Sequence, residues 1–148
     1  TINKASLDKG TVGCVCLHNG HLAAATSTGG MTNKLPGRIG DTPIIGAGNY
    51  ANDMTCAVSG TGTGEEFIRH CVASSVSSRM RFGGCDLKKA AQESVMDLPD
   101  GTGGVIAVDR NGNFAVEFNS TGMFRAVCLD GEYLVGIWNE FIKVPSQD

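Results

Sequence analysis

The chain has 148 residues, of which 41% are hydrophobic and 18% are charged, and its formal net charge is −3. This length and composition predict one modest core and therefore a single domain. The slight acidity, without a basic patch, argues against a nucleic-acid partner. The sequence contains neither an apolar run long enough to cross a membrane nor a signal-like start, which argues against a membrane partner.

Turn dipeptides predict three β-hairpins. Asn19-Gly20, Asn111-Gly112 and Asp130-Gly131 are typical of two-residue hairpin turns. The strands that they join are expected at residues 12–17 with 22–26, 105–108 with 114–118, and 126–129 with 133–138. Residues 1–10, by contrast, are polar and are expected to form a mobile linker end.

Two helices are expected between the first two hairpins. Residues 65–82 follow a capping box from Thr63 to Glu66, and one face of this helix carries Ile68, Val72, Val76 and Met80. Residues 86–96 form the second helix, with Asp86 as its N-cap. Hairpins combined with segregated helices predict an α+β domain.

The dipeptide Gly10-Thr11 is a candidate cleavage and catalytic site. A threonine hydroxyl becomes a good nucleophile only when a base removes its proton, and an α-amine on the same residue can serve as that base. Such an amine has a pKa of about 7.7–8.0, so a useful fraction is unprotonated near neutral pH. Thr11 would therefore become catalytic if the bond after Gly10 were cut, and should be inactive while residues 1–10 remain attached.

A long motif supports this interpretation. Residues 22–41, LAAATSTGGMTNKLPGRIGD, resemble the signature of the plant-type L-asparaginases and isoaspartyl peptidases, which are N-terminal nucleophile hydrolases. Further matching segments bring the resemblance to residues 10–138, and they are Gly46 to Ala51, Ala57 to Glu66, and Asn119 to Arg125. The similarity is to the C-terminal β subunit of that family.

The resemblance implies a four-layer αββα sandwich, of which this chain supplies one half. Residues 1–10 would be the linker end of an α subunit from the same precursor, and residues 11–148 the catalytic β-subunit portion. The opening at Thr1, without a methionine, fits a processed piece or a fragment. The family also implies a dimer of αβ units, no catalytic cofactor, and a structural monovalent cation in the α subunit.

The implied reaction is hydrolysis of L-asparagine and of β-aspartyl (isoaspartyl) dipeptides through a β-aspartyl ester on Thr11. By similarity to the family, Thr28 orients the Thr11 hydroxyl by a hydrogen bond. Arg38 suits the α-carboxylate of such a substrate, and Asp41 suits its α-ammonium, while these two protein charges hold each other in place.

The run from Gly60 to Gly64, just before a helix, is a candidate source of oxyanion donors. By resemblance, the Thr61 hydroxyl and the Gly62 amide take this role, and the Gly64 carbonyl helps to hold the substrate ammonium. A phosphate-binding loop is the rival interpretation, but the Lys-Ser/Thr ending of a Walker motif is absent.

The six cysteines form no Cys-x-x-Cys pair and are expected to be reduced, buried thiols of a cytoplasmic protein. A zinc site is the alternative for one cluster, because two cysteines and a histidine share a strand face and a second histidine lies across the turn. The four residues are Cys14, Cys16, His18 and His21. We favour packing of the cysteines in a core, with no metal bound.

Three classes of function therefore remain open: a threonine hydrolase, a small zinc-binding module, and a catalytically silent structural half. Within the hydrolases, the glycosylasparaginases and the endopeptidase taspase share the threonine nucleophile. The sequences of residues 26–30 and 33–38 resemble the asparaginase and isoaspartyl peptidase branch more closely.

Overall fold

The computed structural model describes residues 9–145, so residues 1–8 of the expected linker and the last three residues lie outside it. Strands β1 (Lys9–His18) and β2 (His21–Met31) form an antiparallel hairpin. Its turn is the predicted one, and Asn19 and Gly20 both adopt positive φ, as a two-residue hairpin turn of this type requires. The strands are longer than expected, because pairing continues through the polar segment that ends at Met31.

A four-stranded antiparallel sheet forms the centre of the chain, in the order β3-β4-β5-β6. Strands β5 (Gly103–Asp109) and β6 (Phe114–Phe118) confirm the second predicted hairpin. The sequence did not reveal β3 (Asn49–Ala51) or β4 (Cys56–Gly62). The first five residues of β4 are all buried, so no alternation of polar and apolar residues marks it as a strand.

Three helices lie between β4 and β5 in the chain: α1 (Gly64–His70), α2 (Val72–Gly83) and α3 (Leu87–Met96). The prediction of one continuous helix over residues 65–82 was wrong, because Cys71 is left-handed and separates α1 from α2. The first amides of α2 find acceptors elsewhere in the chain: Ala73 N–H donates to Ala47 O at 3.1 Å, and Ser74 N–H donates to Gly46 O at 2.9 Å. A long-range contact thus replaces the helical bonds lost at the break.

The predicted helix caps have different outcomes. Asp86 caps α3 as expected, because its carboxylate accepts a hydrogen bond from the Lys89 amide at 2.8 Å. Thr63 is the N-cap residue of α1, but its side chain makes no capping hydrogen bond, so the predicted capping box does not form. Helix α1 is instead anchored by Phe67, which is fully buried.

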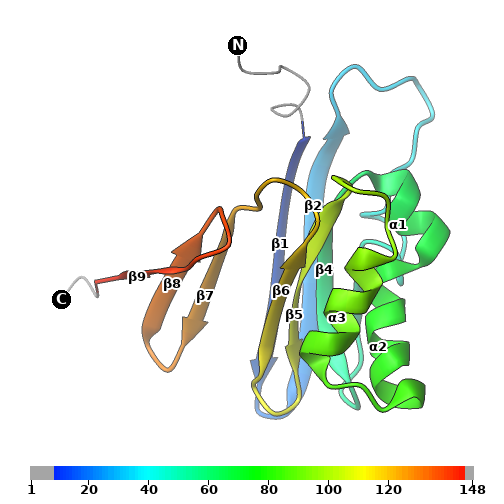
Figure 1. Cartoon of the computed structure of the whole chain (residues 1–148). Coiled ribbons are helices and arrows are strands. Elements are labelled where there is room, and N and C mark those ends of the chain that lie inside the picture. The colour runs from blue at the N-terminus through cyan, green and yellow to red at the C-terminus, as the bar shows by residue number, and fades with distance from the viewer. Residues whose placement is uncertain (1–8, 146–148) are drawn as a thin grey trace.

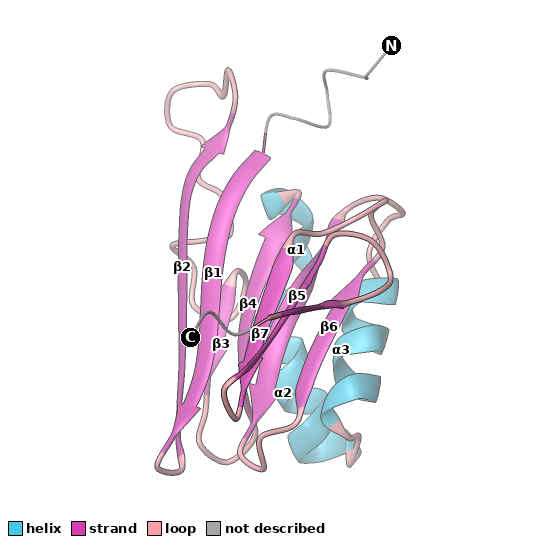
Figure 2. Cartoon of the chain, turned by 90° about the vertical axis from the view of Figure 1, so that its left-hand side faces the viewer, coloured by secondary structure: helices cyan, strands magenta, loops and turns pink. Residues whose placement is uncertain are grey.

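The helices cover one face of the central sheet, and the β1–β2 hairpin lies across the other (Figures 1 and 2). Alternate residues of β4 face the helices and the β1–β2 hairpin. A Cβ on Gly60 would lie 2.4 Å from Phe67 Cε1 on the helical side, whereas Ser59 Oγ would lie 2.1 Å from a Cβ on Gly13 of the hairpin. The helical side contains the main core, including Val58, Phe67, Val72, Val76, Val95 and Val105.

A separate three-stranded sheet projects beside these layers (Figure 1). It contains β7 (Arg125–Leu129), β8 (Glu132–Gly136) and β9 (Ile142–Val144). The third predicted hairpin is therefore present, although β8 ends two residues before the expected position and β9 was not foreseen. The architecture is a mixture of sheets with few helices, as the sequence predicted. No helix within residues 9–145 has the length and hydropathy needed to cross a membrane.

Candidate active site

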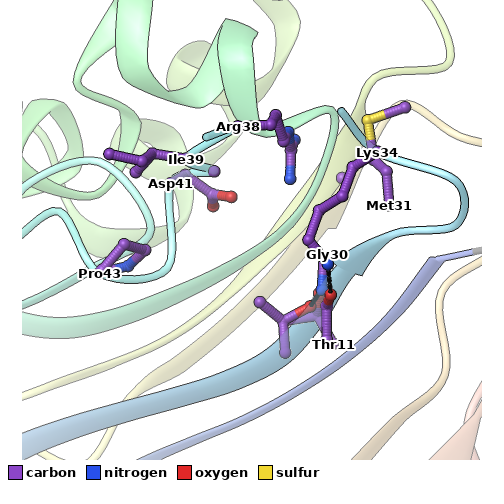
Figure 3. A pocket seen from close by; sticks show the side chains of 12 residues that line it. Thr11, Gly30, Met31, Lys34, Arg38, Ile39, Asp41 and Pro43 are labelled. Carbon is purple, nitrogen blue, oxygen red and sulfur yellow. Dashed lines mark hydrogen bonds between the residues drawn. The ribbon is translucent and has the colours of Figure 1, made fainter. Parts of the chain in front are cut away.

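A cavity of about 220 Å³ lies where the open end of the β1–β2 hairpin meets the loop that follows it (Figure 3). Five of the sequence-predicted residues line it: Thr11, Thr28, Arg38, Asp41 and Gly62. The remaining lining residues are Gly29, Gly30, Met31, Lys34, Ile39, Gly40 and Pro43. Residues from β1, β2, the loop and β4 therefore meet at one place.

Thr11 and Thr28 face each other across the hairpin. They are direct partners in the strand register, just after an irregularity between Lys9 and Thr11. The Thr11 hydroxyl donates to Thr28 Oγ1 at 3.2 Å, and Thr28 in turn donates to the Gly10 carbonyl at 3.0 Å. The Gly30 amide also donates to Thr28 Oγ1, at 2.9 Å. The Thr28 hydroxyl is thus fixed between the candidate nucleophile and the candidate scissile bond.

Arg38 is held by Glu65, not by Asp41 as the sequence suggested. Its Nε donates to Glu65 Oε1 at 2.8 Å and its Nη2 donates to Oε2 at 3.0 Å. These hydrogen bonds are the main reason why the pKa of the Arg38 guanidinium is raised. A bidentate carboxylate fixes the plane of the guanidinium and leaves Nη1 as the nitrogen directed elsewhere.

Asp41 is a buried carboxylate, only 8% exposed, and its Oδ2 has no hydrogen-bond partner. Burial raises the pKa of Asp41, although hydrogen bonds from backbone amides and the charge of Arg38 oppose this shift. A buried acceptor without a partner is costly, and a cationic donor in the cavity would offset that cost. The pair Arg38 and Asp41 thus presents one positive and one negative group to the same cavity (Figure 3).

The glycine-rich end of β4 closes the cavity. Gly62 lines it, and a Cβ at this position would lie 2.3 Å from Thr102 O, so only glycine fits here. Thr61 precedes it in β4, paired with Gly104, and is not a lining residue. Gly64 begins α1 behind the charged groups: a Cβ there would lie 2.8 Å from Asp41 Oδ1 and 3.1 Å from Arg38 Nη2.

Sequence reasoning gave no role to Lys34 or Glu65, which the fold brings to this site. Lys34 stands inside the quoted motif, and its Nζ donates to the Gly29 carbonyl at 2.5 Å. Glu65 was considered only as the first residue of a helix. A largely buried arginine needs a carboxylate partner, and this need could have pointed to Glu65. Asp41, which is nearer to Arg38 in sequence, was the more obvious candidate.

The cysteines depart from expectation: Cys14 and Cys16 are exposed rather than buried in a core, as are Cys71 and Cys128, and only Cys56 is buried. All six are free thiols. Within residues 9–145 no three His, Cys, Asp or Glu side chains gather as a metal site, so the zinc-module alternative gains no support. His21 instead contacts Asp53 at 3.0 Å.

Comparisons with known proteins point to one family. The family model described as asparaginase matches residues 1–136. The chain is 54% identical to the isoaspartyl peptidase of Escherichia coli K12 over 88% of this chain and 42% of that protein. It is 43% identical to the isoaspartyl peptidase/L-asparaginase of Bos taurus, over 86% of this chain and 42% of that protein.

The chain spans about two fifths of the length of these curated relatives. The matched region includes the hairpin with Thr11 and Thr28, the loop with Arg38 and Asp41, and the glycine-rich end of β4. By both the family match and the relatives, the chain belongs to the asparaginase family that includes the isoaspartyl peptidases.

Proposed function

We propose that this protein is an amidohydrolase that uses an N-terminal threonine, released by autoproteolysis at Gly10-Thr11, to hydrolyse L-asparagine and β-aspartyl dipeptides. The observation that carries the proposal is the meeting of the Thr11–Thr28 hydroxyl pair with Arg38 and Asp41 in one cavity. The relatives named isoaspartyl peptidase and L-asparaginase support the same substrate class.

The hydrogen bond from Thr28 to the Gly10 carbonyl, at 3.0 Å, supports a role in processing. It withdraws electron density from the carbon that must be attacked. The Thr11 oxygen then bonds to that carbon, the Gly10-Thr11 C–N bond breaks, and the hydroxyl proton passes to the new α-amine. Water hydrolyses the resulting ester, which releases the Gly10 carboxylate and leaves Thr11 with a free hydroxyl and a free amine.

In the substrate reaction the Thr11 amine acts as general base for its own hydroxyl, which attacks the side-chain carbonyl carbon of the substrate. Ammonia, or the amine of a dipeptide, leaves with the transferred proton. The β-aspartyl ester on Thr11 is then hydrolysed by water that the same amine activates. Thr28 keeps the hydroxyl directed at the substrate through the 3.2 Å hydrogen bond.

The charged groups orient the substrate for that attack. Arg38 would bind the α-carboxylate, while Asp41 and the carbonyl of Gly64 would hold the α-ammonium. The Gly62 amide and the Thr61 hydroxyl would stabilise the oxyanion. Gly62 lines the cavity, which supports the role of its amide. Thr61 does not line the cavity, so its role requires the Thr61 hydroxyl to reach the substrate from behind the lining residues.

The same proposal extends to the assembly. The helix, sheet and hairpin layers are compatible with three layers of an αββα sandwich, whose remaining part an α subunit from the same precursor would supply, in a dimer of αβ units. The structural monovalent cation would be held by that α subunit, and catalysis would need no cofactor. The six free thiols fit the reducing cytoplasm, which we propose as the compartment.

The test compares the wild-type protein with Thr11→Ala and Thr11→Ser. N-terminal sequencing and intact mass report cleavage, and released ammonia and β-aspartyl dipeptide hydrolysis report turnover. We expect a wild-type chain starting at Thr11, no cleavage or turnover in Thr11→Ala, and partial recovery of both in Thr11→Ser. Ser27→Ala, at an exposed site on β2, is the control. A cleaved wild-type protein without turnover would instead identify a catalytically silent relative.

A further inference from the structure

The cavity holds a second cation, Lys34, whose role the proposed reaction leaves open. Its side chain lines the cavity together with Thr11 and Arg38, and Figure 3 shows it running toward Gly30 beside Thr11. Its Nζ donates to the Gly29 carbonyl, which satisfies one of the three donors of an ammonium group. Across the described part of the chain, Lys34 takes part in no ion pair.

Gly30 brings the two cations together. It has φ of 79°, and a Cβ there would lie 3.4 Å from Lys34 Nζ and 3.4 Å from Arg38 Nη1. Lys34 Nζ and Arg38 Nη1 are therefore separated by no more than twice 3.4 Å, and both lie on the side of Gly30 where another residue would carry its side chain. A carboxylate placed over Gly30 could accept hydrogen bonds from both nitrogens.

The partners of Arg38 leave a suitable nitrogen for this purpose. Glu65 accepts from Nε and Nη2, so Nη1 is the nitrogen that reaches Gly30. A Cβ on Gly40 would lie 2.9 Å from the same Nη1, so glycines border this nitrogen on two sides. The absence of side chains at both positions keeps the approach to Nη1 open.

The charges of the lining residues also favour an added anion. Lys34 and Arg38 are cationic and Asp41 is the only acidic residue among the described lining residues. The Glu65 carboxylate, which balances Arg38, lies outside the lining set. An α-amino acid brings one carboxylate for the two cations and one ammonium for Asp41, which matches the charges of the cavity.

We propose that Lys34 is a substrate-binding residue that shares the α-carboxylate of the substrate with Arg38 across Gly30. The inference rests on the proposed function and adds a second cation to its substrate-binding set. A β-aspartyl dipeptide offers another carboxylate, at the end of its leaving residue. The nearness of Nζ to Arg38 Nη1 favours the α-carboxylate, because both nitrogens can then bind one group.

The test measures binding of L-aspartate, the product of the proposed reaction, by isothermal titration calorimetry on the complete processed protein. L-Isoasparagine, which carries a neutral amide in place of the α-carboxylate, is the comparison ligand. In Lys34→Met we expect about tenfold weaker binding of L-aspartate, which is the size of one partly exposed charge-assisted hydrogen bond. Binding of L-isoasparagine should change by less than about twofold.

Lys34→Arg keeps the charge and should recover most of the affinity for L-aspartate. Lys89→Met, at a side chain on α3 that is 63% exposed, removes the same charge outside the cavity and should leave both ligands unaffected. Thermal melts monitored by circular dichroism verify folding, and Lys34→Gln serves as a second neutral variant.

Equal weakening of both ligands in Lys34→Met, or no weakening of either, would overturn the inference, as would a wild-type protein that does not bind L-aspartate. Kinetics give a second discrimination. A loss confined to β-aspartyl dipeptides with a free C-terminus, absent for L-asparagine and for dipeptide amides, would assign Lys34 to the leaving residue and reject the α-carboxylate. If L-aspartate binds through Lys34 but L-asparagine is not hydrolysed, the inference stands and the proposed function fails.

Discussion

Glu65 is the residue whose loss should most clearly separate substrate binding from turnover. It is not one of the residues that line the cavity, but it holds Arg38, which does line it, through two hydrogen bonds of 2.8 and 3.0 Å. In Glu65→Ala the guanidinium is free to turn toward Asp41, whose Oδ2 lacks a partner. The two groups meant for the substrate would then neutralise each other, so binding should weaken.

The size of the effect follows from the geometry. Hydrogen bonds to charged groups contribute about 1.5–3 kcal/mol each when shielded from water. The Glu65 side chain is 44% exposed while that of Arg38 is 16% exposed, so solvent screening reduces the contribution of the pair to about 1–1.5 kcal/mol. Since 1.4 kcal/mol is a factor of ten, the KM for L-asparagine should rise roughly tenfold in Glu65→Ala. Glu65→Gln keeps one acceptor oxygen and should give an intermediate KM.

The assay is steady-state ammonia release from L-asparagine, with kcat and KM determined separately, because loss of substrate orientation without loss of the nucleophile affects mainly KM. Glu93→Ala is the control: its partner Arg79 is 2.8 Å away on the helical surface, and the Glu93 side chain is 40% exposed, close to the 44% of Glu65. An unchanged KM in Glu65→Ala, or a fall in kcat at constant KM, would refute the reasoning.

Three further predictions concern Asp41 and Gly60. Burial raises the pKa of Asp41, so its carboxylate should lose its charge at a higher pH than an exposed aspartate does. The KM for L-asparagine should therefore rise on acidification at a higher pH than titration of an exposed aspartate would give. A KM that stays flat down to about pH 4 would contradict this. Because the raised pKa means that folding favours the protonated form, the charged carboxylate costs stability as pH increases through that pKa. The melting temperature of Asp41→Asn should therefore exceed that of the wild type at pH 7, with the difference shrinking toward about pH 4. Gly60→Ala would place a Cβ 2.4 Å from Phe67 Cε1 and should cost about 1–3 kcal/mol, seen as a lower melting temperature. Gly83→Ala, whose Cβ would lie 3.8 Å from Cys85 Sγ, is the control and should not destabilise the protein.

Local chemistry explains why the hairpins could be predicted. Asn19-Gly20 and Asp130-Gly131 adopt the left-handed conformations that such dipeptides favour, so the turn is encoded in two adjacent residues. The Asp86 cap is equally local. By contrast, β4 is buried over its first five residues, and its composition gives no two-residue period from which a strand could be inferred.

The break at Cys71 and the partner of Arg38 depended on distant parts of the chain. Continuous helical periodicity predicts one helix. The carbonyls of residues 46 and 47, however, accept the first hydrogen bonds of α2 and so compensate for the helical hydrogen bonds lost at the break. In the same way, Asp41 is three residues from Arg38 in sequence, whereas Glu65 is 27 residues away and makes the ion pair. Proximity in sequence was a poor guide because the loop is folded against the start of α1.

The hairpin turns, the family motif and the residue types of the cavity could all be inferred from short segments, because turn preferences and side-chain chemistry are local properties. Which of these residues meet depends on the folded chain. It placed Thr28 between Thr11 and the Gly10 carbonyl, gave Arg38 to Glu65, and brought Lys34 to Gly30. Those choices depend on strand register and on the packing of a loop against a helix, which are set by long-range burial rather than by any local pattern.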